Sequence, residues 1–153
     1  LDATLTSRDV INKRMREVLS FDGAAREHAQ IELFMPESFS GGTIKYRVHW
    51  ECSGASSGDA VWGLQGASLA DNETIDAAYG TAIEITDSHN GAGKRMVTAW
   101  SSALTISGTP AGGEAVSLQL YRKADDSADT INSVDVQLVC VELLIPVSAA
   151  DDS

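Results

Sequence analysis

The chain of 153 residues is short of basic side chains, with 11 Lys and Arg against 22 Asp and Glu and a formal net charge of −11. Nucleic acids and anionic membranes attract basic proteins, so this balance argues against both as general partners. No apolar run approaches the roughly 18 residues of a membrane-spanning helix, and no charged-then-apolar signal peptide stands at the start. We expect neither membrane insertion nor export.

Cysteine is also scarce, with only Cys52 and Cys140. Each lies in an apolar alternating pattern, which favours two reduced core residues over a disulfide, although strand geometry could still bring them together. A chain of this length forms one ordinary domain and buries about 68 to 70 % of its unfolded surface, so it needs no covalent staple. No internal repeat or linker divides it.

Catalytic motifs are missing as well. His28, His49 and His89 are far apart and have no ligand-spaced Cys, His or acidic neighbour, so the sequence predicts no metal site. Ser, His and Asp occur without a nucleophile elbow, and the glycines of 91–94 lack the context of a phosphate-binding loop. We expect no enzyme activity and no cofactor.

One polar loop, 123–132, is rich in acids. Asp125, Asp126 and Asp129 cluster there, but the glycine and terminal glutamate of a calcium loop are absent. The sequence therefore predicts a solvated acidic loop.

The clearest strand pattern runs from Ile44 to Cys52. Apolar residues take every second position and polar residues the others, which is the signature of a half-buried strand. A Gly/Ser-rich turn at 53–58 leads to a second apolar run at 60–64. These two runs are predicted to pair as the central hairpin of the fold.

Other runs complete an all-β pattern. Further strands are predicted at 17–21, 28–35, 81–87, 96–106, 116–120 and 134–147. Asp71–Gly80 is the one segment predicted to be helical, because it begins with capping and acidic residues and ends in glycine. About eight short strands with glycine-rich turns predict an antiparallel β-sandwich, in particular a jelly roll.

The last strand changes its apolar parity between Leu138 and Val141. Either a bulge shifts the register there or both faces of the strand are covered. A strand covered on both faces is central or lies against a neighbouring subunit, so we expect a homo-oligomer, a trimer rather than a dimer. Residues 148–153 are predicted to be a loose acidic tail.

The three tryptophans have two interpretations. Trp50, Trp62 and Trp100 share the parity of aliphatic neighbours, which predicts core packing. Alternatively, they form an aromatic platform for sugar, as in many β-sandwich binding modules.

Residues 1–16 carry a net charge of +2 on a remainder of −13. They are interpreted either as a short amphipathic helix or as an extended arm that runs into the first strand. An arm of opposite charge is drawn to an acidic partner surface, so we expect this segment to anchor the protein. The candidate anchoring residues are Arg8, Ile11, Lys13, Arg14, Met15 and Arg16.

Over residues 17–147, short motifs resemble those of tailed-bacteriophage virion proteins. They are Phe21-Asp22, Met35-Pro36, Gly42-Thr43-Ile44, Trp50, Ser53-Gly54, Val61-Trp62-Gly63-Leu64, the acidic stretch Asp71 to Gly80 that is predicted to be helical, Ser107 to Gly112 and Leu120-Tyr121-Arg122. The resemblance implies a β-sandwich component of the particle, on the head or at the tail fibres. We expect a non-enzymatic capsid decoration (cement) protein that binds the major capsid protein on the outside of the head, in virions assembled in the host cytoplasm. The alternative is a tail-associated receptor- or carbohydrate-binding module.

Overall fold

The computed structural model describes residues 2–8, 16–54, 57–131 and 133–148, and within these ranges it contains β-strands and no helix. The strands are β1 (Thr4–Arg8), β2 (Arg16–Phe21), β3 (Glu27–Phe34), β4 (Lys45–Glu51), β5 (Asp59–Leu69), β6 (Ile83–Ser88), β7 (Arg95–Val97), β8 (Ala115–Arg122) and β9 (Val136–Leu144). The predicted all-β class is confirmed.

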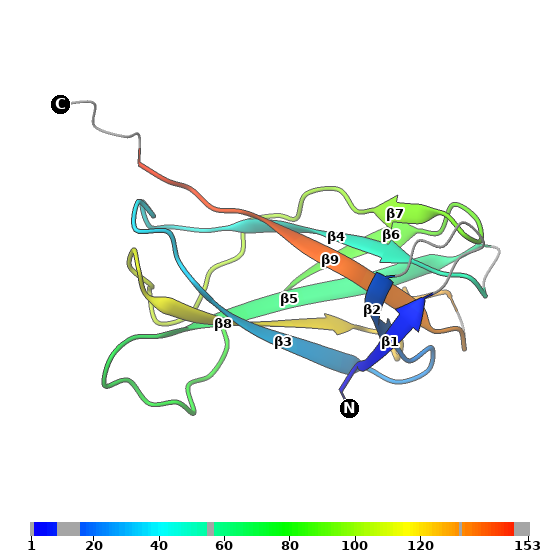
Figure 1. Cartoon of the computed structure of the whole chain (residues 1–153), viewed down its shortest axis with the longest axis horizontal. Helices are drawn as coiled ribbons and strands as arrows, with labels where there is room; N and C mark the ends of the chain where they lie inside the picture. Colours follow the sequence, from blue (N-terminus) through cyan, green and yellow to red (C-terminus); the bar gives the residue numbers. More distant parts are fainter. Residues whose placement is uncertain (1, 9–15, 55–56, 132, 149–153) are drawn as a thin grey trace.

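The strands form two antiparallel sheets that face each other (Figure 1). One sheet has the order β1-β2-β9-β4-β7 and the other β3-β8-β5-β6. From β2 to β9 each strand crosses to the opposite sheet, except that β5 and β6 are neighbours in one sheet. This is the path of a jelly roll, with β1 added at one edge.

The predicted central hairpin is wrong, because β4 and β5 lie in different sheets and do not pair. The predicted alternation itself is right. Its apolar positions are all buried, namely Ile44, Tyr46, Val48, Trp50 and Cys52. A hairpin and a crossover between sheets both place such residues in the core, and the small residues after Cys52 allow either connection.

The predicted helix at Asp71–Gly80 is also wrong. This stretch is irregular and begins with a turn, in which Asn72 has a φ of 63° and the Glu73 Oε2 accepts a hydrogen bond of 2.9 Å from the Ala70 amide. A left-handed residue is incompatible with a continuing right-handed helix. Asp and Asn favour turns for the same reason that they favour helix caps, since their side chains bond nearby backbone groups.

The parity change in the last strand is a β-bulge. Trp50 of β4 lies opposite Leu138, whereas His49 lies opposite Cys140, so Val139 is the additional residue. Beyond it, Val141 pairs with Val48 and shares the inward parity. The bulge alternative is therefore confirmed, and it explains the pattern without a covering subunit.

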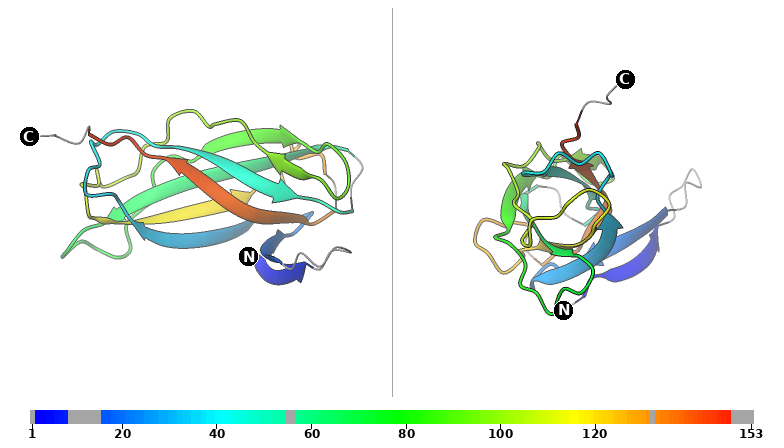
Figure 2. Two further views of the ribbon diagram at one scale, coloured as in Figure 1. Left: turned by 45° about the horizontal axis from the view of Figure 1, so that its top comes forward. Right: turned by 90° about the vertical axis from the view of Figure 1, so that its left-hand side faces the viewer.

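The β1–β2 hairpin leaves the sandwich at one side (Figure 2). β2 pairs with β9 only through Leu19, Ser20 and Phe21, while its earlier residues pair with β1 alone. The predicted strand at 17–21 is confirmed as part of β2. The departure of the hairpin leaves one edge of β9 without a neighbouring strand from Cys140 to Leu144 in the described part of the chain.

Aromatic side chains fill the core at the end near β2. Trp50 and Trp62 are fully buried, with ring centroids 6.4 Å apart, and Phe21 meets Trp62 edge-on at 5.1 Å. The Trp50 Nε1 donates a 2.7 Å hydrogen bond to Asp87. The prediction that these two tryptophans belong to the core is confirmed.

The predictions for two residues, Asp129 and Cys140, are wrong. Asp129 is 4 % exposed and lies 2.8 Å from the buried Arg122 guanidinium, so it is not a solvated residue of an acidic loop. Cys52 is buried as predicted, but Cys140 is exposed because its position after the bulge points it away from the core. Both cysteines are free.

Candidate functional site

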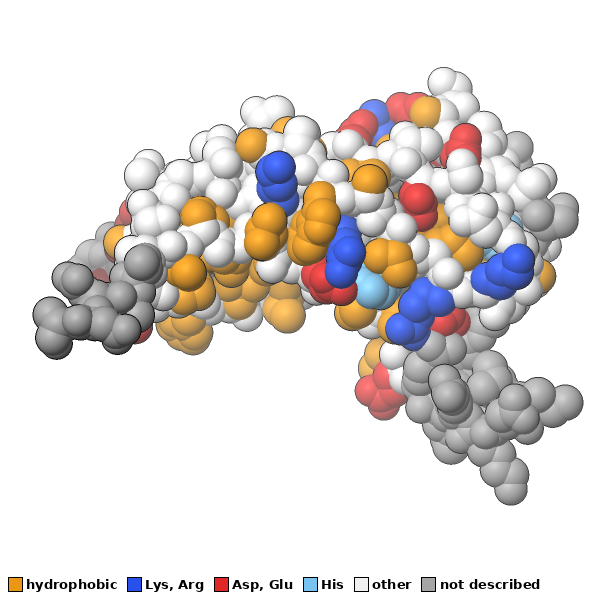
Figure 3. Space-filling model, turned by 90° about the horizontal axis from the view of Figure 1, so that it is seen from above, with side chains coloured by type: hydrophobic (Ala, Val, Ile, Leu, Met, Phe, Trp, Pro, Cys, Tyr) orange, Lys and Arg blue, Asp and Glu red, His pale blue; other side chains and the backbone are white. Residues whose placement is uncertain are grey.

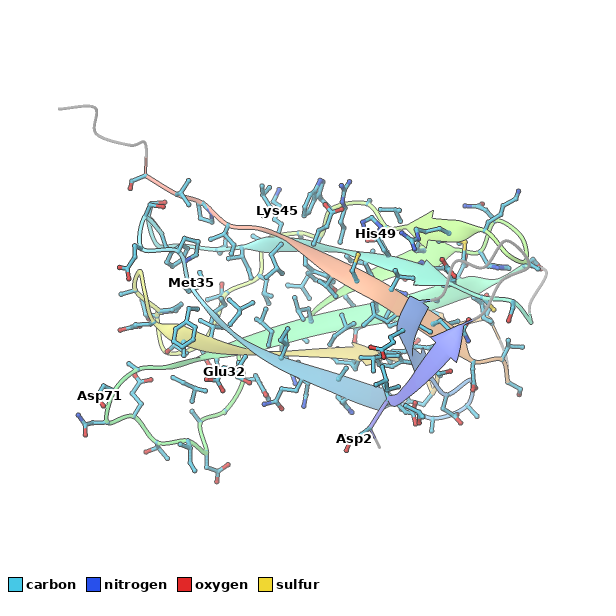
Figure 4. The ribbon with its side chains drawn as sticks, viewed as in Figure 1. Asp2, Glu32, Met35, Lys45, His49 and Asp71 are labelled. Atoms are coloured by element: carbon cyan, nitrogen blue, oxygen red, sulfur yellow. The ribbon has the colours of Figure 1, made fainter. Side chains whose placement is uncertain are left out.

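The outer surface of the five-stranded sheet holds the site that can best bind a ligand. Its side chains come from β4, β7, β9 and the segment that follows β7. We call this surface the Trp100 face, and it consists of Lys45, Arg47, His49, Arg95, Val97, Trp100 and Glu142. In Figure 4, Lys45 and His49 stand on the same side of the sandwich, away from the core.

Trp100 reaches this surface through a local irregularity. The Thr98 amide donates to the Val48 carbonyl (3.0 Å) and the Ser101 amide to the Tyr46 carbonyl (2.8 Å). The two residues between Thr98 and Ser101 are exposed, and Trp100 has 39 % of its surface accessible. The prediction that Trp100 belongs to the core is therefore wrong.

The sequence does contain a signal for this irregularity. The hydroxyl of Thr98 accepts a hydrogen bond from the Val48 amide, and that of Ser101 accepts one from the Tyr46 amide, both at 3.0 Å. Two hydroxyl residues spaced three apart thus take the place of backbone partners along β4. The Thr-x-x-Ser spacing interrupts the strict alternation on which the prediction for Trp100 depended.

A connected set of side chains supports the Trp100 ring. The Arg47 guanidinium carbon lies 4.7 Å from the ring centroid, and the same guanidinium pairs with the Glu142 Oε2 at 2.7 Å. The other oxygen of Glu142 lies 2.7 Å from the His49 Nε2. Hydrogen bonds from Arg47, and then from His49, hold the pKa of the Glu142 carboxyl below its ordinary value. Arg47 is therefore fixed beside the ring rather than free to turn.

The charge of the Trp100 face differs from that of the whole molecule. It carries three Lys or Arg side chains and two carboxylates, the half-buried Glu142 beside Arg47 and the buried Glu51 beside Arg95. Figure 3 looks onto this side and shows basic and hydrophobic side chains next to one another along it. An aromatic ring among charged donors and acceptors suits a ligand that has both apolar and polar faces.

The opposite outer surface, on the four-stranded sheet, is polar but satisfied internally. Gln65 donates to Gln119 at 2.7 Å, and Gln30 donates to the Ser117 hydroxyl at 2.9 Å. These polar side chains use part of their hydrogen-bonding capacity on one another, and Phe34 is exposed at the end of β3. Among the described residues, no exposed tryptophan lies on this surface.

A groove of about 430 Å³ lies between the edges of β3 and β9. It is lined by Leu19, Ala29, Gln30, Ile31, Leu33, Leu64, Leu118, Leu120, Leu138, Cys140, Val141 and Leu143. Ile31 is 62 % exposed here because β2 turns away and leaves the groove open. Its aliphatic walls cannot bond the hydroxyl groups of a sugar, but they suit an apolar protein surface.

A second hollow, near the start of β3, contains Asp22, Glu27 and Asp135. Each carboxylate already accepts a backbone hydrogen bond. The amides of Ala24 and Ala25 lower the pKa of Asp22. These acids fix the turn between β2 and β3, and among the described residues no group of His, Cys, Asp and Glu side chains could hold a metal ion.

The predicted anchoring residues are only partly placed. Arg8 and Arg16 are backbone partners in the register of β1 and β2. The others, Ile11, Lys13, Arg14 and Met15, lie outside the described residues.

Within the described ranges, no helix has the length and apolar character needed to cross a membrane.

Neither a protein-family model nor a curated protein sequence matches the chain. A solved structure that does resemble it is the CBM22-2 xylan-binding domain of Xyn10C from Paenibacillus barcinonensis. The TM-score is 0.50 at 14 % sequence identity, and the match covers 94 % of this chain and 88 % of that one. At this identity the likeness concerns the fold, and the two chains share a β-sandwich architecture.

Proposed function

We propose that the chain is a non-enzymatic tailed-bacteriophage virion protein that acts as a receptor- or carbohydrate-binding module through its Trp100 face. The observation that carries the proposal is the exposed Trp100 ring, held beside Arg47, Glu142 and His49. The sequence motifs supply the link to virion proteins. A fold shared with a xylan-binding domain is in keeping with a carbohydrate ligand.

The chemistry of the Trp100 face suits a sugar ring. A pyranose presents C–H groups on its flat sides and hydroxyl groups around its rim. The indole can pack against the C–H groups, while Arg47 donates to hydroxyl oxygens and Glu142 accepts from hydroxyl hydrogens. Because the ion pair already fixes Arg47 and Glu142, binding loses less side-chain entropy than it would on mobile side chains.

Replacing Trp100 with alanine is expected to abolish glycan binding on an array and to leave the fold intact, because the ring is not part of the core. The lost contact with Arg47 costs about 0.5 to 1 kcal/mol of stability at an exposed site. Trp100→Phe should retain weaker binding because an aromatic surface remains. Glycan binding that is unchanged in Trp100→Ala would exclude this face.

A second candidate function, capsid decoration, is favoured by the groove between β3 and β9. In the described part of the chain, β9 has an edge beyond Val139 that pairs with no strand and lies next to exposed aliphatic side chains, which is typical of a protein contact. The partner would be the major capsid protein or a second copy of this chain. The anchoring residues of 1–16 would add to such a contact.

Binding to purified phage heads tests this second function. Ile31→Asp places a charge in the groove and should weaken attachment, whereas Thr86→Asp, at an exposed position of β6, should not. Deletion of residues 1–16 measures the contribution of the basic segment in the same assay. Failure of the unaltered protein to bind bare heads would remove capsid decoration as a function.

A further inference from the structure

We infer that the ligand of the Trp100 face is a polyanionic glycan, one that carries carboxylate, phosphate or sulfate groups along its chain. This inference rests on the proposed function and adds the chemical class of the ligand. It follows from where the few basic residues lie. On a chain with 11 basic and 22 acidic residues, Lys45, Arg47 and Arg95 share one face of the sandwich.

These cations follow β4 in a line rather than forming one cluster. Lys45 lies near the start of β4, Arg47 follows on the same face, and Arg95 of β7 lies opposite Glu51 at the other end. Six residues of extended strand separate the two ends, a span of about 20 Å. Trp100 lies beside Arg47, within this span. The arrangement matches an extended chain with several charged groups better than a single small anion.

The cations at the two ends remain accessible. Lys45 is exposed, and the Arg95 side chain is 39 % exposed, with its Nε 3.4 Å from the Glu51 carboxylate. A charged residue can protect the edge of a sheet from pairing with another chain, and this role would explain the cation at Arg95 because β7 is an edge strand. It does not explain the cations at Lys45 and Arg47, because β4 is an interior strand. A neutral sugar needs no such line of cations.

The remaining surface would direct a polyanion to this face. Figure 4 shows Glu32 and Asp71 on the side of the molecule away from Lys45 and His49. Glu84, on β6 of the four-stranded sheet, is also exposed. An approaching polyanion is repelled by the acidic surfaces and attracted only where the local charge is positive. Attraction at this face therefore cannot arise from the net charge of the protein, which is −11.

Affinity electrophoresis tests the inference with three polyanions, polygalacturonate, dextran sulfate and a glycerol phosphate polymer, against neutral xylan and dextran. We expect at least one polyanion to retard the migration of the protein. The polymer that does so shows whether the bound group is a carboxylate, a sulfate or a phosphate. Binding should weaken as salt rises. Lys45→Ser and Arg95→Ser should each weaken it about two- to fivefold. Lys123→Ser is the matched control, because it removes one charge from the four-stranded side and should change nothing.

The outcomes separate this inference from the proposed function. Binding of neutral glycans as strong as that of polyanions, lost in Trp100→Ala but unchanged in Lys45→Ser, would overturn the anionic class and keep the glycan-binding function. Binding to none of the five polymers, together with a blank glycan array, would overturn both. Polyanion binding that Lys123→Ser weakens as much as Lys45→Ser would also overturn the inference, because the cations of the Trp100 face would then have no special part.

Discussion

Replacing Trp62 with alanine is expected to lower the free energy of unfolding by about 3 to 5 kcal/mol. Trp62 is fully buried between the sheets and contacts both Phe21 and Trp50. Truncation removes a large apolar surface and leaves a cavity. The two sheets cannot close this cavity, because the hydrogen bonds between its own strands hold each sheet in place. Trp50→Ala should be comparably destabilising, and it also leaves the Asp87 carboxylate without its 2.7 Å donor.

Urea denaturation, followed by circular dichroism, measures these losses. Trp62→Phe should recover part of the stability because it fills part of the cavity. Trp100→Ala is the matched control within the same residue type, and it should change the free energy of unfolding by no more than about 1 kcal/mol. A Trp100→Ala loss as large as that of Trp62→Ala would show that Trp100 is a core residue and not a binding platform.

Replacing Arg122 with methionine is expected to cost about 3 to 5 kcal/mol, because it leaves the buried Asp129 carboxylate without its charged partner. Arg122 and Asp129 are 0 % and 4 % exposed. The Arg122 Nε and Nη2 donate to the two Asp129 oxygens at 2.9 and 2.8 Å. Its remaining donors reach the carbonyls of Asp22, Ile131 and Val134, so one side chain ties the β2–β3 turn to the β8–β9 connection.

Three variants isolate the contribution of this ion pair. Asp129→Asn should be strongly destabilising as well, since it leaves the buried guanidinium charge unneutralised. The double change Arg122→Met with Asp129→Leu should be less destabilising than the sum of the single changes, because neither charge then remains buried. Lys123→Ser removes two partly exposed ion pairs, with Glu84 and Asp126, at the next position in the sequence and should cost about 0 to 1 kcal/mol. Additive single and double changes would contradict direct coupling between Arg122 and Asp129.

Local patterns in the sequence predict most of the strands, although the strand predicted at 96–106 is wrong beyond Val97, where β7 ends. The patterns do not determine which strands pair. The alternation from Ile44 to Cys52 correctly identifies the buried side of β4. It does not distinguish a hairpin from a crossover, because both leave the same side chains buried. The capping residues after Leu69 likewise fit a helix start or a turn, and the positive φ of Asn72 places them in a turn.

The candidate site was harder to predict because it depends on departures from regular strands. Trp100 has the parity of a core residue, and only the outward loop between Thr98 and Ser101 moves it to the surface. The line of cations also depends on the fold, since β7 brings Arg95 beside β4 from a distant part of the sequence. Asp129 lies in a polar loop by composition, yet the fold buries it against the Arg122 guanidinium and the Val61 amide.

The most direct test of the central claim follows the three indole N–H signals by ¹H–¹⁵N correlation spectra during titration with a polyanionic oligosaccharide. The Trp100 signal should shift with ligand concentration, and the signals of the buried Trp50 and Trp62 should stay in place. Assignment comes from the Trp100→Phe variant, in which one signal disappears. A shift confined to residues of the groove between β3 and β9, with the Trp100 signal unchanged, would contradict glycan binding at the Trp100 face.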